Sequence, residues 1–129
     1  MKTKKRTKDA KSVESGSRNI RKSLDKLWSE NIRFRDKKCI HCGSTFRIAA
    51  HHIFSRRYSS VRWDLDNGVS LCYPCHIHWA HSKYEEFRDW VIELIGDKYE
   101  DLKRRAYEIK KFSPTELKIL KKELESGGL

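Results

Sequence analysis

The sequence predicts a small α+β protein in which helices flank a short stranded core that is held together by cysteines. Apolar residues recur at helical spacing toward both ends of the chain, and the period shortens to that of strands in the middle. Two Cys-x-x-Cys pairs bracket the stranded part. A length of 129 residues fits one modest domain with appendages.

The N-terminal part divides into an arm and a helix. Residues 1–17 are rich in Lys, Ser and Thr and nearly free of apolar side chains, so we expect a disordered basic arm. Over residues 18–38 the apolar residues return at three- and four-residue steps, which indicates one face of a helix. We therefore expect this helix to lead directly into the first cysteine pair.

Residues 39–95 form the predicted core. Short strands are expected near Phe46–Ala50 and Val69–Leu71, with a long loop from Ser55 to Asp66 between them. A stripe of apolar residues from Phe87 to Ile95 then predicts a helix.

Residues 96–129 are expected to form C-terminal helices. Gly96 is placed to end the preceding helix, and an amphipathic helix should follow Asp97. Ser113-Pro114-Thr115-Glu116 has the pattern of a capping box, which predicts the start of a last helix. These helices are neutral overall with apolar stripes, so they are candidates for packing or for homodimer formation.

The chain has a net charge of +11, and most of the excess lies in its first third. Such a field attracts nucleic acid, although a solubilising tail would have the same composition. No apolar run approaches the roughly 20 residues of a membrane span, and the start lacks the apolar stretch of a signal peptide. We therefore expect a cytoplasmic protein with DNA as its partner and no membrane association.

All six histidines and all four cysteines fall between Cys39 and His81. Thiolates in two Cys-x-x-Cys pairs are the ligand set of a closed, tetrahedral Zn²⁺ site, and zinc binding supplies folding energy that so small a core lacks. We expect one structural zinc on Cys39, Cys42, Cys72 and Cys75. His41, inside the first pair, is expected to be solvated.

The segment between the cysteine pairs contains Ala50-His51-His52-Ile53, then Asn67, and it ends on Cys72-Tyr73-Pro74-Cys75-His76. His52 and Asn67 are 15 residues apart, and Asn67 and His76 are nine apart. This order and spacing resemble the ββα-metal motif of HNH endonucleases with four-cysteine zinc knuckles. More weakly, Leu24–Trp28, Ile32–Asp36 and His52–Arg57 are similar to phage recombination endonucleases of the NinG type.

The HNH resemblance implies roles for the four residues of the motif. His52 would be the general base, and His51 and His76 would hold a divalent ion that contacts the scissile phosphate. Asn67 would fix the loop and the orientation of the base. Because adjacent strand residues point to opposite faces, His51 and His52 can serve one phosphate only if the strand ends or twists there.

The third ligand of the divalent ion is open. Many HNH proteins have a histidine four residues after the position of His76, but Ala80 stands there, with His78 and His81 nearby. Five residues along an α-helix turn a side chain about 140° away, so His81 needs an irregular backbone to join His76. We favour His81 over His78, and water remains the third option. So open a site favours Mg²⁺ or Mn²⁺.

The resemblance implies a nuclease that hydrolyses DNA phosphodiesters, encoded by a phage or prophage and acting in the host cytoplasm. On the long loop, Arg56, Arg57 and Arg62 are candidate phosphate contacts, or else solvated loop residues. The rival interpretation is a zinc-binding DNA module without catalysis. Within the enzyme class, the NinG-type similarity favours a structure-selective nuclease for branched recombination DNA.

Overall fold

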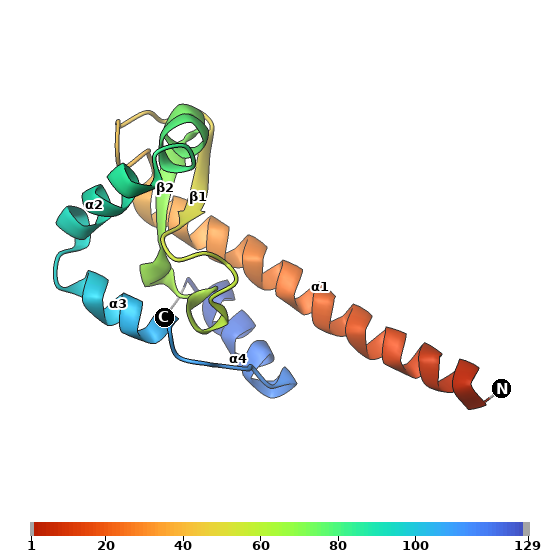
Figure 1. The fold of residues 1–129 in the computed structure, drawn as a ribbon. Helices are drawn as coiled ribbons and strands as arrows, with labels where there is room; N and C mark the ends of the chain where they lie inside the picture. The colour runs from red at the N-terminus through yellow and green to blue at the C-terminus, as the bar shows by residue number, and fades with distance from the viewer. Residues whose placement is uncertain (1, 128–129) are drawn as a thin grey trace. The chain divides into compact units, whose positions relative to one another are not determined.

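The computed structural model describes the backbone of residues 2–127 and side chains from residue 18 (Figure 1). Contacts group the chain into two units. One unit runs from Trp28 to Lys111, and the other combines Met1–Leu27 with Phe112–Leu129. The larger unit contains both cysteine pairs and all the histidines. It therefore extends beyond the core expected at residues 39–95, since it includes the end of the first helix and a further helix after Gly96.

The centre of the larger unit is an antiparallel hairpin of β1 (Ile48–His52) and β2 (Gly68–Cys72). The register pairs Ile48 with Cys72 at one end and His52 with Gly68 at the other. Helices surround this two-stranded sheet, so the predicted α+β class is confirmed. β1 lies two residues later than expected and therefore contains the two adjacent histidines, whereas β2 is the expected strand with one more residue at each end.

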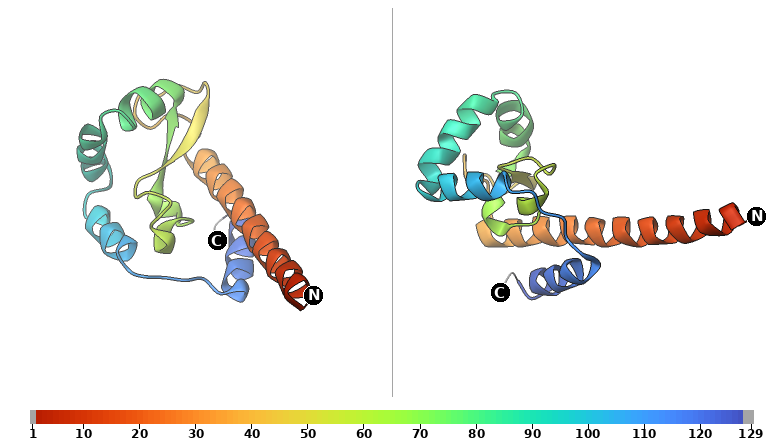
Figure 2. Two further views of the ribbon diagram at one scale, coloured as in Figure 1. Left: turned by 45° about the vertical axis from the view of Figure 1, so that its right-hand side comes forward. Right: turned by 60° about the horizontal axis from the view of Figure 1, so that its bottom comes forward.

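The strands are joined by a segment with two 3₁₀ turns, η1 (Ser59–Val61) and η2 (Leu65–Asn67). The expected long loop is thus partly ordered. After β2 come the π-helix η3 (Pro74–Ala80), α2 (Tyr84–Ile95) and α3 (Lys98–Ala106). The views in Figure 2 show α2 and α3 following one another along one side of the hairpin, and α3 contacts η1.

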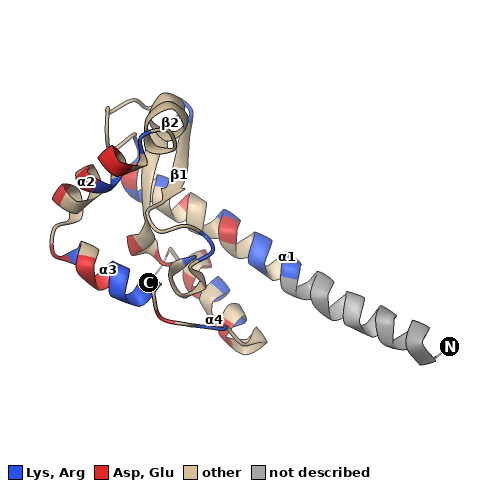
Figure 3. Cartoon of the chain, viewed as in Figure 1, with Lys and Arg blue, Asp and Glu red and all other residues tan. Residues whose placement is uncertain are grey.

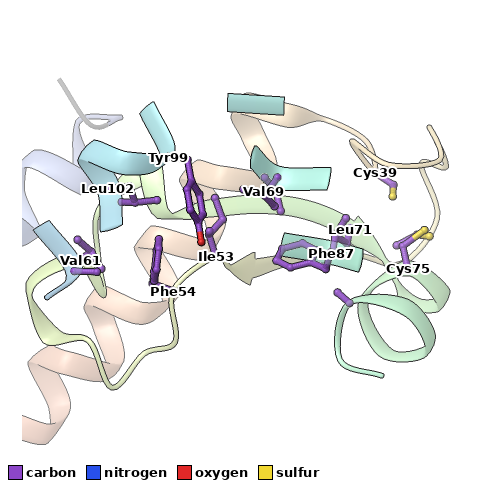
Figure 4. Packing of buried hydrophobic residues seen from close by; sticks show 14 residues of the cluster. Cys39, Ile53, Phe54, Val61, Val69, Leu71, Cys75, Phe87, Tyr99 and Leu102 are labelled. Carbon is purple, nitrogen blue, oxygen red and sulfur yellow. The ribbon is translucent and has the colours of Figure 1, made fainter. Parts of the chain in front are cut away.

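Side chains from the hairpin and both helices form one continuous core (Figure 4). Phe87 of α2 packs beside Val69 and Leu71 of β2, and the cysteine sulfurs close one end of the cluster. At the other end, Leu102 of α3 lies near Val61. The core therefore fixes the hairpin against α2 and α3.

Ion pairs also connect α3 to the segment before β2. Acidic residues occupy the first turn of α3 and basic residues its last turn (Figure 3). From the last turn, Arg105 forms ion pairs with Asp64 and, at 3.2 Å, with Asp66. Arg105 also pairs with Asp101 of its own helix at 3.0 Å. This network holds the second 3₁₀ turn next to the helix.

The terminal helices are α1 (Lys2–Asp36) and α4 (Pro114–Glu125). α1 begins at Lys2 rather than near residue 18, so the backbone of the expected disordered arm is helical in its described part; Lys and Ala favour helix, and no proline interrupts the run. The predicted capping box at α4 is confirmed, because Ser113 Oγ accepts from the N–H of Glu116 at 3.1 Å and Glu116 reaches back to Ser113. No helix in the described part of the chain is long and apolar enough to cross a membrane.

Candidate functional site: a thiol cluster beside a histidine cluster

The larger unit brings the four cysteines together. Two come from the turn after α1, one ends β2, and one lies in η3. Their sulfur atoms all lie within 4.8 Å of one another: Cys39, Cys42, Cys72 and Cys75. Tetrahedral zinc with bonds of about 2.3 Å places its sulfur ligands roughly 3.8 Å apart, so the cluster is suited to a structural zinc.

The cluster has supporting contacts typical of zinc knuckles. The backbone N–H of Cys42 lies 3.4 Å from the sulfur of Cys39, and His41 Nδ1 lies 3.4 Å from the sulfur of Cys75. The ring of His41 also stacks on Trp79, with centroids 3.8 Å apart. Although His41 is exposed, it is therefore not simply solvated as expected: Trp79 fixes its ring while one nitrogen faces a sulfur.

The thiols differ in acidity. Burial raises the pKa of Cys39, but hydrogen bonds from the backbone of Cys42, Cys72 and His41 outweigh burial and lower it to about 7. Burial and the neighbouring sulfurs raise the pKa of Cys75 well above its ordinary value. Burial also raises the pKa of Cys72, so the thiols of Cys72 and Cys75 resist losing their protons unless a cation joins them. This is the chemistry of a metal-binding cluster.

A second cluster consists of three histidines. His51 extends from β1, His76 lies in η3, and His81 follows η3; one nitrogen of each lies within 4.8 Å of the others. The Nε2 atoms of His76 and His81 are 3.1 Å apart. Nitrogen ligands about 2.1 Å from one ion lie roughly 3.0–3.4 Å from each other, so these two imidazoles are placed to share an ion.

The π-helix explains how His76 and His81 meet. The N–H of His81 donates to the carbonyl of His76 at 3.2 Å, a bond between residues five apart. Such a turn is wider than an α-helical turn, so residues at this spacing share a face. His78 lies outside the cluster, with its ring against Tyr73 at 5.7 Å. Of the two candidate histidines for the third ligand, the structure brings His81, and not His78, next to His51 and His76.

Burial favours the neutral form of two histidines in the cluster, His51 and His76. His51 is 8% exposed, and burial, with the neighbouring His76, His81 and His52, lowers its pKa to about 3. Burial and the nearby His81 also lower the pKa of His76. Neutral imidazole is the form that binds a cation, so His51 and His76 are prepared as ligands.

His52 faces away from the histidine cluster. Its Nε2 lies 2.8 Å from the carbonyl oxygen of Arg62, and its ring is stacked on Trp28. A carbonyl only accepts, so Nε2 carries the proton and Nδ1 is the basic nitrogen of the neutral ring. As adjacent residues of a strand, His51 and His52 point in different directions. β1 ends at His52, and both side chains line one cleft.

Asn67 is fully buried at the end of η2, directly before β2, and its side chain bonds only to backbone atoms in the contacts described. Its Oδ1 accepts from the N–H of Phe54 at 2.7 Å, and its Nδ2 donates to the carbonyls of Phe54 at 2.9 Å and Val61 at 3.0 Å. Asn67 therefore closes the loop of residues 54–61. That loop leads directly into Arg62, the residue whose carbonyl holds His52.

A cleft of about 900 Å³ contains both His52 and the histidine cluster. Arg56 and Arg57 line it, whereas Arg62 is not among its lining residues and places its guanidinium 5.0 Å from the ring of Trp63. Arg88 of α2 and Lys103 of α3, which no motif in the sequence indicated, also line the cleft. Their helical positions were predicted, but nothing in the local pattern indicated that both helices border the histidines.

Comparison with protein families shows one match over almost the whole chain. The family described as bacteriophage lambda NinG protein matches residues 1–127. Comparisons with curated proteins and with solved structures gave no match. The family match covers the thiol cluster, the histidine cluster and the helices around them. This chain therefore belongs to the NinG family.

Proposed function

We propose that this chain is an HNH-type endonuclease that hydrolyses DNA phosphodiester bonds with the help of a divalent ion. The observation that carries the proposal is the meeting of three clustered histidines with a fourth, separately held histidine in one cleft. Phosphodiester hydrolysis requires a base that deprotonates water and a cation that neutralises the phosphate. The fourth histidine is of the right type for the base, and the cluster of three histidines is of the right type to bind the cation.

His51, His76 and His81 would hold the divalent ion, and the thiol cluster would hold the structural zinc. When bound, Mg²⁺ or Mn²⁺ would neutralise the negative charge that grows on the phosphate and the leaving oxygen. The two clusters differ in chemistry: soft thiolates select zinc, while a site with three ligands leaves room for phosphate oxygens.

His52 would remove the proton from the attacking water. Its Nε2 donates to the Arg62 carbonyl, so Nδ1 accepts the proton, and the resulting imidazolium keeps the same hydrogen bond. Asn67 would act indirectly, because it fixes the loop that ends at Arg62. It bonds to backbone alone in the contacts described, and its role would be to hold the geometry of the base.

Basic residues at the cleft would position DNA through its phosphates. Arg56 and Arg57 come from the loop after β1, and Arg88 and Lys103 come from the facing helices. Phosphate contacts fix the register of a duplex without reading its sequence. This arrangement favours cleavage with little base specificity.

Incubation of purified protein with supercoiled plasmid tests the proposal. Nicked product should appear with Mg²⁺ or Mn²⁺ and be absent without added metal. His52→Ala should reduce the rate by about 10²–10⁴-fold while DNA binding persists. His78→Ala is the matched control, because His78 is exposed and lies outside the cluster, and it should cut at the wild-type rate.

Two alternatives make different predictions in the same assay. A zinc-binding DNA module without catalysis would bind plasmid but never nick it in any metal. A structure-selective nuclease, which the family match favours, would cut a four-way junction faster than a linear duplex of equal length. Equal rates on both substrates would favour the general nuclease.

A further inference from the structure

Trp28 lies on α1, before the segment of residues 39–81 that resembles the HNH motif. It is 2% exposed. Its indole ring is stacked on the imidazole of His52, with ring centroids 3.8 Å apart and planes inclined by only 5°. This near-parallel contact covers one face of the His52 ring with a side chain from outside the motif.

The orientation of Trp28 is itself fixed by two contacts along one edge of its indole. Its Nε1 donates to the carbonyl of Asp64 at 2.8 Å. Next to it along the same edge, Cζ2 faces Gly68, the strand partner of His52, where an added Cβ would come 2.5 Å from Cζ2. The backbone of Gly68 is extended, so the glycine serves close approach and not an unusual turn. The indole therefore has little freedom to tilt.

The end of α1 is held to the same part of the hairpin. Arg35 donates to the carbonyls of Leu65 at 2.7 Å and Gly68 at 2.8 Å. Asp36 accepts from the N–H of Ser70 in β2 at 2.8 Å. These bonds fix the helix that carries Trp28 to the strand opposite His52, so the stacking partner cannot drift away from it.

The hydrogen bond and the stacking restrain different motions of the His52 ring. The bond from Nε2 to the Arg62 carbonyl holds one edge of the ring. The χ2 torsion of histidine is broad and gives little restraint of its own. Stacking on a fixed indole restrains the plane of the ring, and with it the direction of Nδ1.

We propose that Trp28 is a positioning residue that fixes the plane of the His52 imidazole and so directs Nδ1 toward the cleft. The inference rests on the proposed function, because it assigns a support to the base of that reaction. It extends the candidate site to α1, which contributes no residue to the motif. Misplacement of a reacting group by about 1 Å can cost roughly 100-fold in rate.

The kinetic test compares Trp28→Phe and Trp28→Leu with the wild type in the nicking assay. Trp28→Leu should lower kcat by about 10- to 100-fold with little change in KM, because the base and not the DNA contact is disturbed. Trp28→Phe, which keeps a stacking ring, should recover most of kcat. Trp90→Leu is the control: it also removes a core-packed tryptophan, but one that contacts His41 and Trp79 rather than His52, and kcat should persist.

A double-mutant cycle separates positioning from general structural damage. In a His52→Ala background, Trp28→Leu should cause no further loss of residual cleavage, because its effect acts through the missing imidazole. An equal loss in both backgrounds would overturn the proposal. So would an unchanged kcat in a folded Trp28→Leu protein.

A spectroscopic test does not depend on cleavage. In the wild-type protein, the ring protons of His52 should show an upfield NMR shift from the indole beneath them, and this shift should disappear in Trp28→Leu. Ordinary shifts in the wild type would overturn the proposal even if the variant fails to fold. If the shift is present and the wild type never nicks DNA, the proposed function fails while the stacking stands.

Discussion

The backbone N–H of His81 donates to the carbonyl of His76 at 3.2 Å, which closes a turn of the π type. This bond brings the two imidazoles within 3.1 Å at Nε2, although their spacing would separate them on a regular α-helix. The ligand set of the histidine cluster therefore depends on a local irregularity of the backbone.

His81→Ala should weaken binding of the divalent ion. Mutation of a residue that only hydrogen-bonds to a metal ligand already lowers the affinity for the metal by about 10- to 100-fold. Loss of a ligand itself should lower it by at least as much. Titration with Mn²⁺, followed by calorimetry and by the rate of plasmid nicking, measures the effect. High Mn²⁺ should restore part of the rate. Comparable weakening by His78→Ala would show that the choice of ligand is wrong.

Asn67→Ala should destabilise the fold. The change leaves the N–H and the carbonyl of Phe54 without their buried partner, at about 1–3 kcal/mol for each unsatisfied group, while the carbonyl of Val61 keeps its bond from the N–H of Asp64. Urea unfolding should show a loss of roughly 2 kcal/mol or more. Asn19→Ala, at an exposed position, is the control and should change stability by less than about 0.5 kcal/mol.

The thiol cluster should retain one zinc ion per chain after treatment with a mild chelator, because four thiolates leave no open position. Cys72→Ser should lower the zinc content and the melting temperature together, since the binding energy of zinc contributes to folding. Elemental analysis and thermal unfolding on the same samples check both. A folded protein that has lost all its zinc would contradict the prediction.

Acid should destabilise the protein partly through His51. Burial, then His76 and His81, lower the pKa of His51 to about 3, while the unfolded value is about 6.5. The unfolded chain then binds more protons below pH 6.5, so stability should fall as pH is lowered from about 6.5 toward 3. Above that window this group contributes no pH dependence.

Thermal unfolding between pH 7 and pH 5, without added divalent ion, measures this effect. His51→Phe keeps a ring in the buried space but removes the titrating group, and it should reduce the loss of stability at low pH. Both proteins retain the thiol cluster, so acid release of zinc is common to them. If the wild type and His51→Phe show the same pH dependence of stability, the acid effect comes from groups other than His51.

Removal of residues 1–17 should weaken DNA binding with little effect on cleavage at saturating DNA, because phosphate contacts supply affinity and not chemistry. Binding measured over a range of salt concentrations should show a shallower slope for the truncated chain. An unchanged slope would mean that these residues do not contact DNA.

Several features could be predicted because they follow from residue type and short spacing. The paired cysteines indicated one cluster, and the Ser113 to Glu116 capping box indicated the start of α4. Gly96, placed to end the preceding helix, has a positive φ at the end of α2, as expected of a helix C-cap. In each case a few adjacent residues determine the local geometry.

Other features depend on contacts between distant segments. The stacking of Trp28 on His52 joins residues that lie far apart in the chain, and the helical pattern of α1 only marked Trp28 as one apolar position among several. Arg88 and Lys103 border the cleft because α2 and α3 pack beside the hairpin. The basic, polar composition of residues 1–17 indicated a disordered arm, whereas the helix propensity of lysine and alanine agrees with the start of α1 at Lys2.

The π-helix η3 also bears on how this site can vary among related chains. A π turn contains one residue more than an α-helical turn between its hydrogen-bonded groups. The stretch from His76 to His81 is therefore equivalent to an α-helical turn with a single inserted residue. A chain with its two histidines four residues apart would present the same pair from a regular α-helix. Insertion of one residue and widening of the turn must then occur together. A search for two histidines at one fixed spacing would find chains of one kind and miss chains of the other.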